Sequence, residues 1–199
     1  MAVRYVALGD SYTIGTGVRP PDRWPDQLCA GLGDEPGLEL IANLGVNGYT
    51  SADLIRHELP ALEALEPEFA SVLIGVNDVV QGVRTARYET NVAVILDALL
   101  ERLAADRLIA VAIPDYTVTP AGAEFGDPRR RQTSILAANA VMAEQTRARG
   151  IGWVDIFDVS LRARDDRSLV ASDGLHPSGA QYGLWVERIA PVVKGRLAR

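Results

Sequence analysis

The stretch VRYVALGDSY, residues 3–12, decides the fold class of this chain. It begins with a short apolar run, Val3–Leu8, which predicts a buried β-strand. A glycine and two polar residues follow at once, so we expect the strand to end in a sharp turn. Ser11 lies in that turn, where its hydroxyl can point outward and its backbone N–H can face a ligand.

Four more apolar segments, rich in β-branched residues, repeat this strand pattern. They are Leu38–Ala42, Phe69–Ile74, Leu108–Ile113 and Trp153–Ile156. Helical periodicity separates them, most clearly in Tyr88–Ala105, where apolar residues recur at i, i+3, i+4 and i+7. Strands that alternate with helices predict a three-layer, doubly wound α/β domain with a five-stranded parallel sheet.

Three further helices are predicted from their end signals. Ser51–Leu65 has a capping serine at its start and Pro60 as a kink or early end. Arg129–Arg149 is closed by the glycine that follows it. The last helix is expected over Pro177–Leu197, because proline suits a first helical position.

The composition indicates an ordinary globular protein. The 199 residues fit one domain, and 48% hydrophobic with 23% charged residues excludes a disordered or fibrous chain. A net charge of −6 disfavours nucleic acid and anionic membranes as partners. Cys29 is the single cysteine, so no internal disulfide and no cysteine-based zinc site is expected, and no other metal site is predicted.

The first residues and the apolar runs of the chain indicate in which cellular compartment we expect the protein. The first nine residues contain no long apolar run followed by a small-residue cleavage site. No uninterrupted apolar stretch approaches the ~18 residues of a membrane span. We therefore expect a cytoplasmic protein without a membrane span.

Polar residues follow four of the predicted strands. These groups are Gly9–Tyr12, Asn43–Gly48, Gly75–Asp78 and, further beyond the fifth strand, Asp173–Pro177. In a doubly wound sheet, ligands bind beyond the carboxyl ends of the strands. We therefore expect the four groups to form one site.

The residue types in these groups suit nucleophilic catalysis. Ser11 is the candidate nucleophile, and His176 is the candidate base, because imidazole exchanges protons near neutral pH. Asp173 lies three residues before the histidine, close enough for a tight turn to bring its carboxylate to the ring. The backbone N–H groups of Ser11 and Gly48 and the amide of Asn77 are the candidate oxyanion donors, with Gly45 as an alternative to Gly48.

These groups resemble the signature blocks of the GDSL/SGNH hydrolase superfamily. The four signature residues, a serine, a glycine, an asparagine and a histidine, correspond here to Ser11, Gly48, Asn77 and His176. The resemblance runs from residue 9 to residue 177. It implies hydrolysis of esters or thioesters on a flavodoxin-like fold, without a cofactor.

The first block departs from the family name, because Tyr12 stands where leucine is expected. Tyrosine there resembles a subset of bacterial esterases, some of which replace the carboxylate of the triad by a backbone carbonyl. Asp173 argues against that variant.

Several residues admit two interpretations. Tyr12, Tyr49, Val79 and Tyr116 are candidates for lining an acyl pocket, together with the long loops Tyr116–Pro128 and Arg164–His176. His57 is expected at the surface, and Trp24 in the core. Arg129, Arg130 and Arg131 could bind an anionic group, but a solvated helix face is the better interpretation.

The predicted function is hydrolysis of a small carboxylic ester, short-chain or carbohydrate-linked, through an acyl-enzyme. Acyl transfer and thioester cleavage would use the same residues and stay open alternatives. A third hypothesis is a binding module for a phosphate ligand, with the loop Ser11–Gly17 as its site. That loop lacks the lysine of a Walker A motif and the third glycine of a dinucleotide fingerprint.

Overall fold

The structure is a computed structural model that describes residues 2–33 and 37–198, and its strands form one parallel sheet. The five strands are β1 (Val3–Gly9), β2 (Leu38–Asn43), β3 (Phe69–Leu73), β4 (Leu108–Val111) and β5 (Gly152–Val154). They lie in the order β2-β1-β3-β4-β5, and every neighbouring pair is parallel. The predicted five-stranded, doubly wound α/β fold is confirmed, with the strand order of flavodoxin-like proteins.

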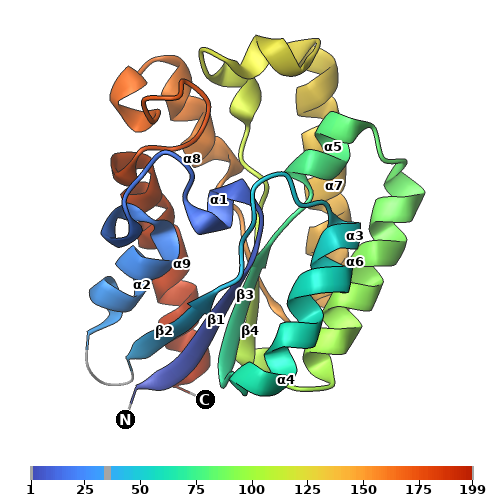
Figure 1. Cartoon of the computed structure of the whole chain (residues 1–199), viewed down its shortest axis with the longest axis vertical. Coiled ribbons are helices and arrows are strands. Elements are labelled where there is room, and N and C mark those ends of the chain that lie inside the picture. The colour runs from blue at the N-terminus through green and yellow to red at the C-terminus, as the bar shows by residue number, and fades with distance from the viewer. Residues whose placement is uncertain (1, 34–36, 199) are drawn as a thin grey trace.

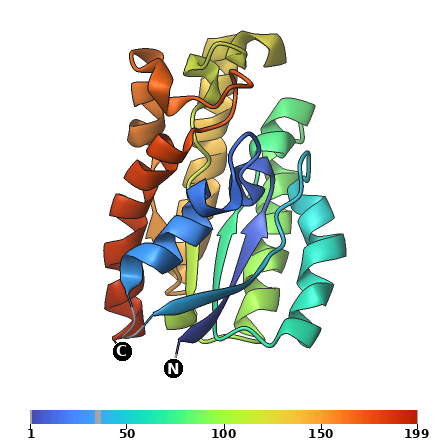
Figure 2. The same ribbon diagram turned by 60° about the vertical axis from the view of Figure 1, so that its left-hand side comes forward.

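Helices cover both faces of this sheet (Figures 1 and 2). On one face lie α2 (Trp24–Leu32) and α9 (Gly179–Leu197), which pack against each other. The other face is covered by α6 (Thr85–Leu100), α7 (Pro128–Ala148) and the helical segment between β2 and β3. The shorter helices are α1 (Ser11–Ile14), α3 (Ser51–Asp53), α4 (Leu62–Leu65), α5 (Val76–Gln81) and α8 (Phe157–Leu161).

The core lies on both faces of β1. Tyr5, Val6, Ala7 and Leu8 are all fully buried, as expected for an inner strand of a parallel sheet that helices cover on both faces. Trp24 is fully buried as well, which confirms the prediction that it belongs to the core.

The strand register brings the polar groups together. Gly9, at the end of β1, pairs with Leu73, at the end of β3. The residues that follow these two strands therefore emerge at the same edge of the sheet. Ser11 and Asn77 are both among them.

Several predicted helix ends and caps are wrong. The helix predicted over Tyr88–Ala105 runs over Thr85–Leu100, and the one predicted over Arg129–Arg149 runs over Pro128–Ala148. The last helix begins at Gly179, not at Pro177, because the Ser178 hydroxyl accepts the N–H of Gln181 and caps it. The cap of α3 is Thr50, not Ser51. Thr50 and Asp53 bond reciprocally in a capping box, which leaves the next serine inside the first turn.

The segment predicted as one helix over Ser51–Leu65 changes helix type along its length. A π-helical turn, Leu54–Glu58, follows α3, and a 3₁₀ turn containing Pro60 leads into α4. Proline lacks an N–H and interrupts regular α-helical bonding, which accounts for a change at this point. The wide turn directs Glu58 into the interior, where it is 2% exposed.

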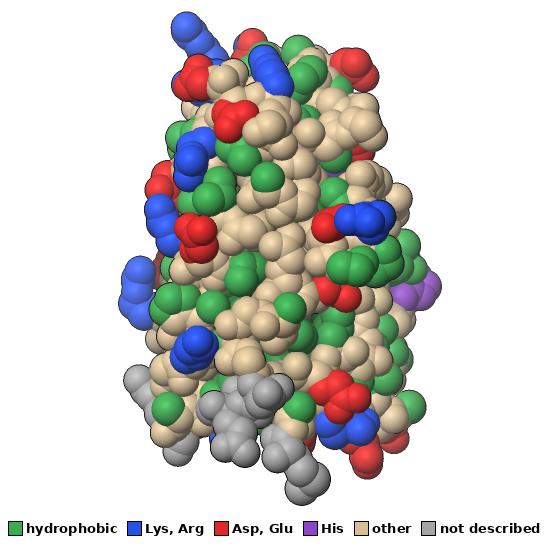
Figure 3. All heavy atoms as spheres, turned by 90° about the vertical axis from the view of Figure 1, so that its left-hand side faces the viewer, with side chains coloured by type: hydrophobic (Ala, Val, Ile, Leu, Met, Phe, Trp, Pro, Cys, Tyr) green, Lys and Arg blue, Asp and Glu red, His purple; other side chains and the backbone are tan. Residues whose placement is uncertain are grey.

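Figure 3 shows the side of the molecule on which α2 and α9 lie. Acidic and basic side chains are scattered over this side, and neither kind gathers into a large patch. Within the described ranges, no helix combines the length and the apolar character that crossing a membrane would require.

Candidate active site

The turn that carries Ser11 is built by short-range contacts. Asp10 precedes α1 and accepts the N–H of Tyr12 at 3.0 Å through Oδ1. Gly9 has a φ of 152°, and a Cβ there would lie 2.2 Å from the Leu73 carbonyl oxygen, so no other residue fits. The backbone N–H of Ser11 makes no hydrogen bond within the described residues, and the serine lines a cavity.

His176 comes from a loop near the end of the chain and is held by Asp173. The ring Nδ1 lies 2.6 Å from Asp173 Oδ2, while Oδ1 of the same carboxylate accepts the N–H groups of Leu175 and His176 at 2.9 and 3.0 Å. Partial burial acts to raise the pKa of Asp173, but these N–H donors and the imidazole outweigh it and lower the pKa. The aspartate is therefore a carboxylate, and it fixes the proton of the ring on Nδ1 and leaves Nε2 free.

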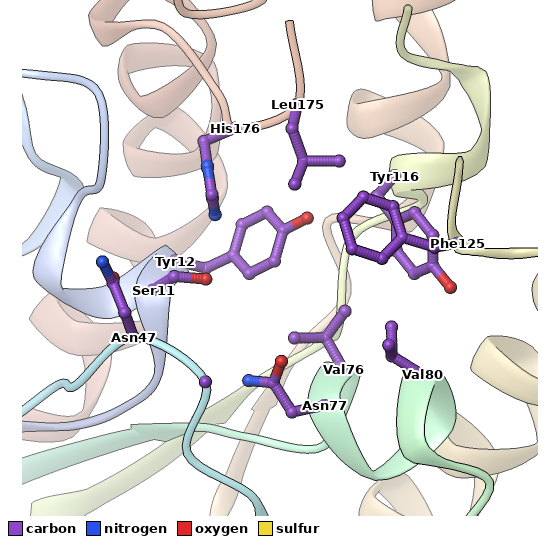
Figure 4. Close-up of a pocket in the computed structure, with 11 residues that line it drawn as sticks. Ser11, Tyr12, Asn47, Val76, Asn77, Val80, Tyr116, Phe125, Leu175 and His176 are labelled. Carbon is purple, nitrogen blue, oxygen red and sulfur yellow. The ribbon is translucent and has the colours of Figure 1, made fainter. Parts of the chain in front are cut away.

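Ser11 and His176 line the same cavity, and in Figure 4 the ring nitrogen is directed toward the serine. Their side chains make no direct hydrogen bond in the described part of the chain. Such contacts are often long in unliganded enzymes and tighten only around a substrate.

Two potential oxyanion donors reach this cavity from the neighbouring strands. Gly48 has a φ of 82° and nothing within 4 Å of a Cβ position, so its backbone borders open space. Asn77, in α5, donates one amide hydrogen to the carbonyl of Tyr49 at 2.9 Å. This bond fixes the orientation of the amide, and Asn77 lines the same cavity as Ser11 and Gly48 (Figure 4).

The alternative glycine, Gly45, has a packing function instead. A Cβ there would lie 2.7 Å from the Ile14 nitrogen and 2.8 Å from the Asp10 carbonyl oxygen. The loop after β2 therefore uses its first glycine to approach the serine turn and Gly48 to border the cavity.

The cavity has a volume of about 240 Å³. Two of the four predicted lining residues, Tyr12 and Tyr116, line it, whereas Tyr49 and Val79 do not. The full set of lining residues is Ser11, Tyr12, Asn47, Gly48, Val76, Asn77, Val80, Tyr116, Phe125, Leu175 and His176. Val76 and Val80 are four residues apart and so share one face of α5, while Val79 points toward a separate hollow and Tyr49 packs its ring on that of the exposed His57.

Two loop contacts shape the far wall of the cavity. Arg131 donates to the carbonyl oxygens of Phe125 at 2.8 Å and Val79 at 2.5 Å, so it ties the loop before α7 to α5. This arginine is therefore half-buried rather than part of a solvated face, unlike Arg129 and Arg130. The same loop joins the histidine loop, because the N–H of Ala121 donates to the carbonyl of Gly174 at 2.9 Å.

Buried carboxylates lie behind the serine turn. Glu58 accepts the N–H of Gly9 at 2.8 Å, and Asp78 accepts both the N–H and the hydroxyl of Ser51, at 2.8 and 2.6 Å. Burial raises the pKa of Asp10 and that of Glu58 to about 8. The charge of Asp78 adds to the rise for Asp10, and the charge of Asp10 adds to the rise for Glu58. Both carboxyl groups are therefore predominantly protonated at neutral pH.

The sequence analysis assigns no role to Glu58. One feature of the sequence does indicate that Glu58 is buried. Leu54, Glu58 and Leu62 are spaced by four residues, which places the glutamate on the apolar stripe of its segment.

No cluster of three or more His, Cys, Asp or Glu side chains suited to a metal ion occurs within residues 2–33 and 37–198. The groups gathered at the cavity are instead a serine, an imidazole with its carboxylate, and several N–H donors. This set can activate a hydroxyl and stabilise a negative charge that develops on a carbonyl oxygen.

Comparison with known proteins finds matches over nearly the whole chain. The sequence model of the GDSL-like Lipase/Acylhydrolase family matches residues 7–184. Esterase TesA of Pseudomonas aeruginosa is 25% identical over 196 residues, covering 95% of this chain and 87% of that protein.

Solved structures share the fold. A lipase/acylhydrolase from Enterococcus faecalis superimposes with a TM-score of 0.75 at 22% identity, over 98% of this chain and 96% of the other. A variant of Axe2, an acetyl xylan esterase from Geobacillus stearothermophilus, superimposes with a TM-score of 0.71 at 18% identity, over 96% and 94% of the two chains.

Proposed function

Because this chain belongs to the GDSL-like lipase/acylhydrolase family of esterases, we propose that it hydrolyses short-chain carboxylic esters, free or carbohydrate-linked, through an acyl-enzyme on Ser11. One observation carries the proposal. Ser11 and His176 are 165 residues apart in sequence yet line one cavity, together with Gly48 and Asn77.

In the first half of the reaction, the Ser11 oxygen attacks the ester carbonyl carbon and its proton moves to Nε2 of His176. The carbon–oxygen bond to the alcohol then breaks, and the alcohol leaves with that proton. The products are an acyl-serine and a neutral imidazole.

In the second half, a water molecule attacks the acyl-serine and gives its proton to His176. The bond to the Ser11 oxygen breaks, the serine regains the proton, and the carboxylic acid leaves. Asp173 keeps the imidazole in one tautomer and stabilises it while it is charged, as its 2.6 Å contact with Nδ1 allows.

The negative oxygen formed in both halves needs donors in fixed positions. The N–H groups of Ser11 and Gly48 fit this role, because neither makes a hydrogen bond within the described residues. The Asn77 amide is the third donor, held in place by its bond to the Tyr49 carbonyl.

The size of the cavity supports a small acyl group. Its volume of about 240 Å³ lies below the ~300–1,000 Å³ typical of sites for drug-sized ligands. The fold relative Axe2 is an acetyl xylan esterase, which favours including carbohydrate-linked acetyl groups among the substrates to be tested.

The proposal is tested by labelling and by a substrate series. A fluorophosphonate should label the wild type at Ser11 and leave Ser11→Ala unlabelled, with turnover lost. Ser134→Ala, which alters an exposed serine on α7, serves as the control and should keep both properties. Nitrophenyl esters from acetate to decanoate should show kcat/KM falling once the acyl chain outgrows the cavity. Full activity of Ser11→Ala would refute the proposal.

A further inference from the structure

The ring of Tyr12 is fixed from several sides. Its backbone N–H donates to Asp10, and its ring packs against the rings of His176 and Trp185, at centroid distances of 5.3 and 6.4 Å. The direction of the phenol hydroxyl is therefore set by the fold before any ligand binds.

This hydroxyl points into the cavity, away from Ser11 and toward Leu175 and the wall formed by Tyr116 and Phe125 (Figure 4). Among the described residues this hydroxyl makes no hydrogen bond, and the only side-chain partner of Tyr12 is the Asp10 carboxylate at its backbone N–H. The side chains of Val76, Val80, Phe125 and Leu175 line this part of the cavity and carry no polar atoms. Burial, aided by the charge of Asp10, raises the pKa of Tyr12 well above its ordinary value, so the hydroxyl stays a neutral donor.

A plain alkyl chain in the cavity would displace water from this hydroxyl and leave it unpaired. An unpaired buried donor is costly, and a site built to bond a polar group discriminates against ligands that lack one. A chain with an oxygen atom at the right position would satisfy the donor.

We propose that the cavity is specific for acyl groups that carry an ether, hydroxyl or keto oxygen a few bonds beyond the ester carbonyl, and that the Tyr12 hydroxyl donates a hydrogen bond to that oxygen. The inference rests on the proposed esterase function and adds the chemical class of the acyl group. Because Tyr12 follows Ser11 directly in the chain, its hydroxyl lies at a fixed distance from the acyl carbonyl. We therefore expect one position of the oxygen atom along the acyl chain to give the highest kcat/KM relative to hexanoate.

The test is an oxygen scan along one chain length. The nitrophenyl esters of hexanoate and of 3-, 4- and 5-oxahexanoate differ by one CH₂ replaced by oxygen, and kcat/KM for each oxa ester is divided by that for hexanoate. This ratio is measured in the wild type and in Tyr12→Phe. Comparing the two enzymes cancels the intrinsic reactivity of each ester.

Tyr116→Phe is the matched control. Its hydroxyl also has no hydrogen-bond partner among the described residues, but that oxygen is buried and out of reach of a ligand, although the residue lines the same cavity. We expect Tyr12→Phe to lower the ratio about tenfold at one oxygen position, the effect of one hydrogen bond, and Tyr116→Phe to change it less than about twofold. Tyr12→Phe removes no hydrogen bond of the protein itself, so the variant should fold.

Equal ratios in the wild type and Tyr12→Phe at all three positions would overturn the inference while leaving the esterase function intact. A Tyr12-dependent effect seen only with oxygens in the alcohol part of acetate esters would overturn the assignment to the acyl chain. Failure of the wild type to be labelled at Ser11, with no cleavage of any ester from acetate to decanoate or of the oxa esters, would refute the proposed function and this inference with it.

Discussion

The serine turn has a cavity side and a buried side, which differ in whether their backbone N–H groups are hydrogen-bonded. Toward the cavity, the N–H groups of Ser11 and Gly48 and the hydroxyl of Tyr12 make no hydrogen bond within the described residues. On the buried side, Glu58 accepts the N–H of Gly9 in the turn, and Asp78 accepts the N–H of Ser51 in the neighbouring α3. The comparison shows that hydrogen bonds on the buried side stabilise the turn, whereas the hydrogen-bond donors on the cavity side remain free to bind a substrate. Changes on the two sides should therefore have separable effects.

The largest effect is expected from Asp173→Asn on the cavity side. The variant keeps an oxygen for the N–H groups of Leu175 and His176 but cannot hold the proton of the ring on Nδ1. We expect kcat to fall about 10³–10⁴-fold with unchanged thermal stability. Steady-state kinetics and a melting curve measure both, and more than a tenth of wild-type kcat would contradict the role of Asp173.

Asn77→Ala should have the next largest effect. It removes one donor to the oxyanion, so kcat should fall about 10²–10³-fold with little change in KM. A rise in KM at constant kcat would show instead that Asn77 contributes to ground-state binding.

On the buried side, Glu58→Ala leaves the N–H of Gly9 without an acceptor. Urea unfolding should show a loss of about 1–3 kcal/mol in the free energy of unfolding. Glu58→Gln keeps an acceptor oxygen and should recover most of this loss. Equal stability of both variants and the wild type would mean that the bond does not hold the turn.

The last prediction concerns the pH dependence of stability. The pKa of Glu58 is about 8 in the folded protein against 4.5 in a model peptide, and that of Asp10 is about 8 against 3.8. The folded state therefore binds protons more tightly than the unfolded state. Their contribution to stability is complete below about pH 4 and is lost as the pH rises through 8.

Glu58→Gln removes one of these two protons and should flatten this decline. Urea midpoints measured from pH 5 to 9 test it. A wild-type midpoint that rises steadily over this range would contradict the raised pKa values.

The parts of the molecule that sequence could predict depend on strand periodicity and on local motifs. Ser11, Gly48 and Asn77 each follow an apolar strand, and parallel strands bring their carboxyl ends to one edge, so their proximity could be predicted. The five strands were predictable for the same reason, since each is an apolar run of suitable length.

The parts that sequence missed depend on contacts between distant segments. Ser51 has the residue type of a helix cap, yet Thr50 caps the helix and Ser51 turns inward to Asp78. Val79 and Val80 are equally apolar, and only the rotation of α5 against its neighbours decides which of them borders the cavity. Neither the capping residue of α3 nor the rotation of α5 can be predicted from the pattern of a single sequence.

The bond between Ala121 and Gly174 has a consequence for how the enzyme admits its substrate. It fastens the loop that bears Phe125 to the loop that bears His176, although more than fifty residues separate them in sequence. An acyl group too large for the cavity would displace the loop that bears Phe125. Because the two loops are hydrogen-bonded, this displacement would move His176 away from Ser11. Oversized esters should therefore be discriminated against in the rate of chemistry as well as in affinity.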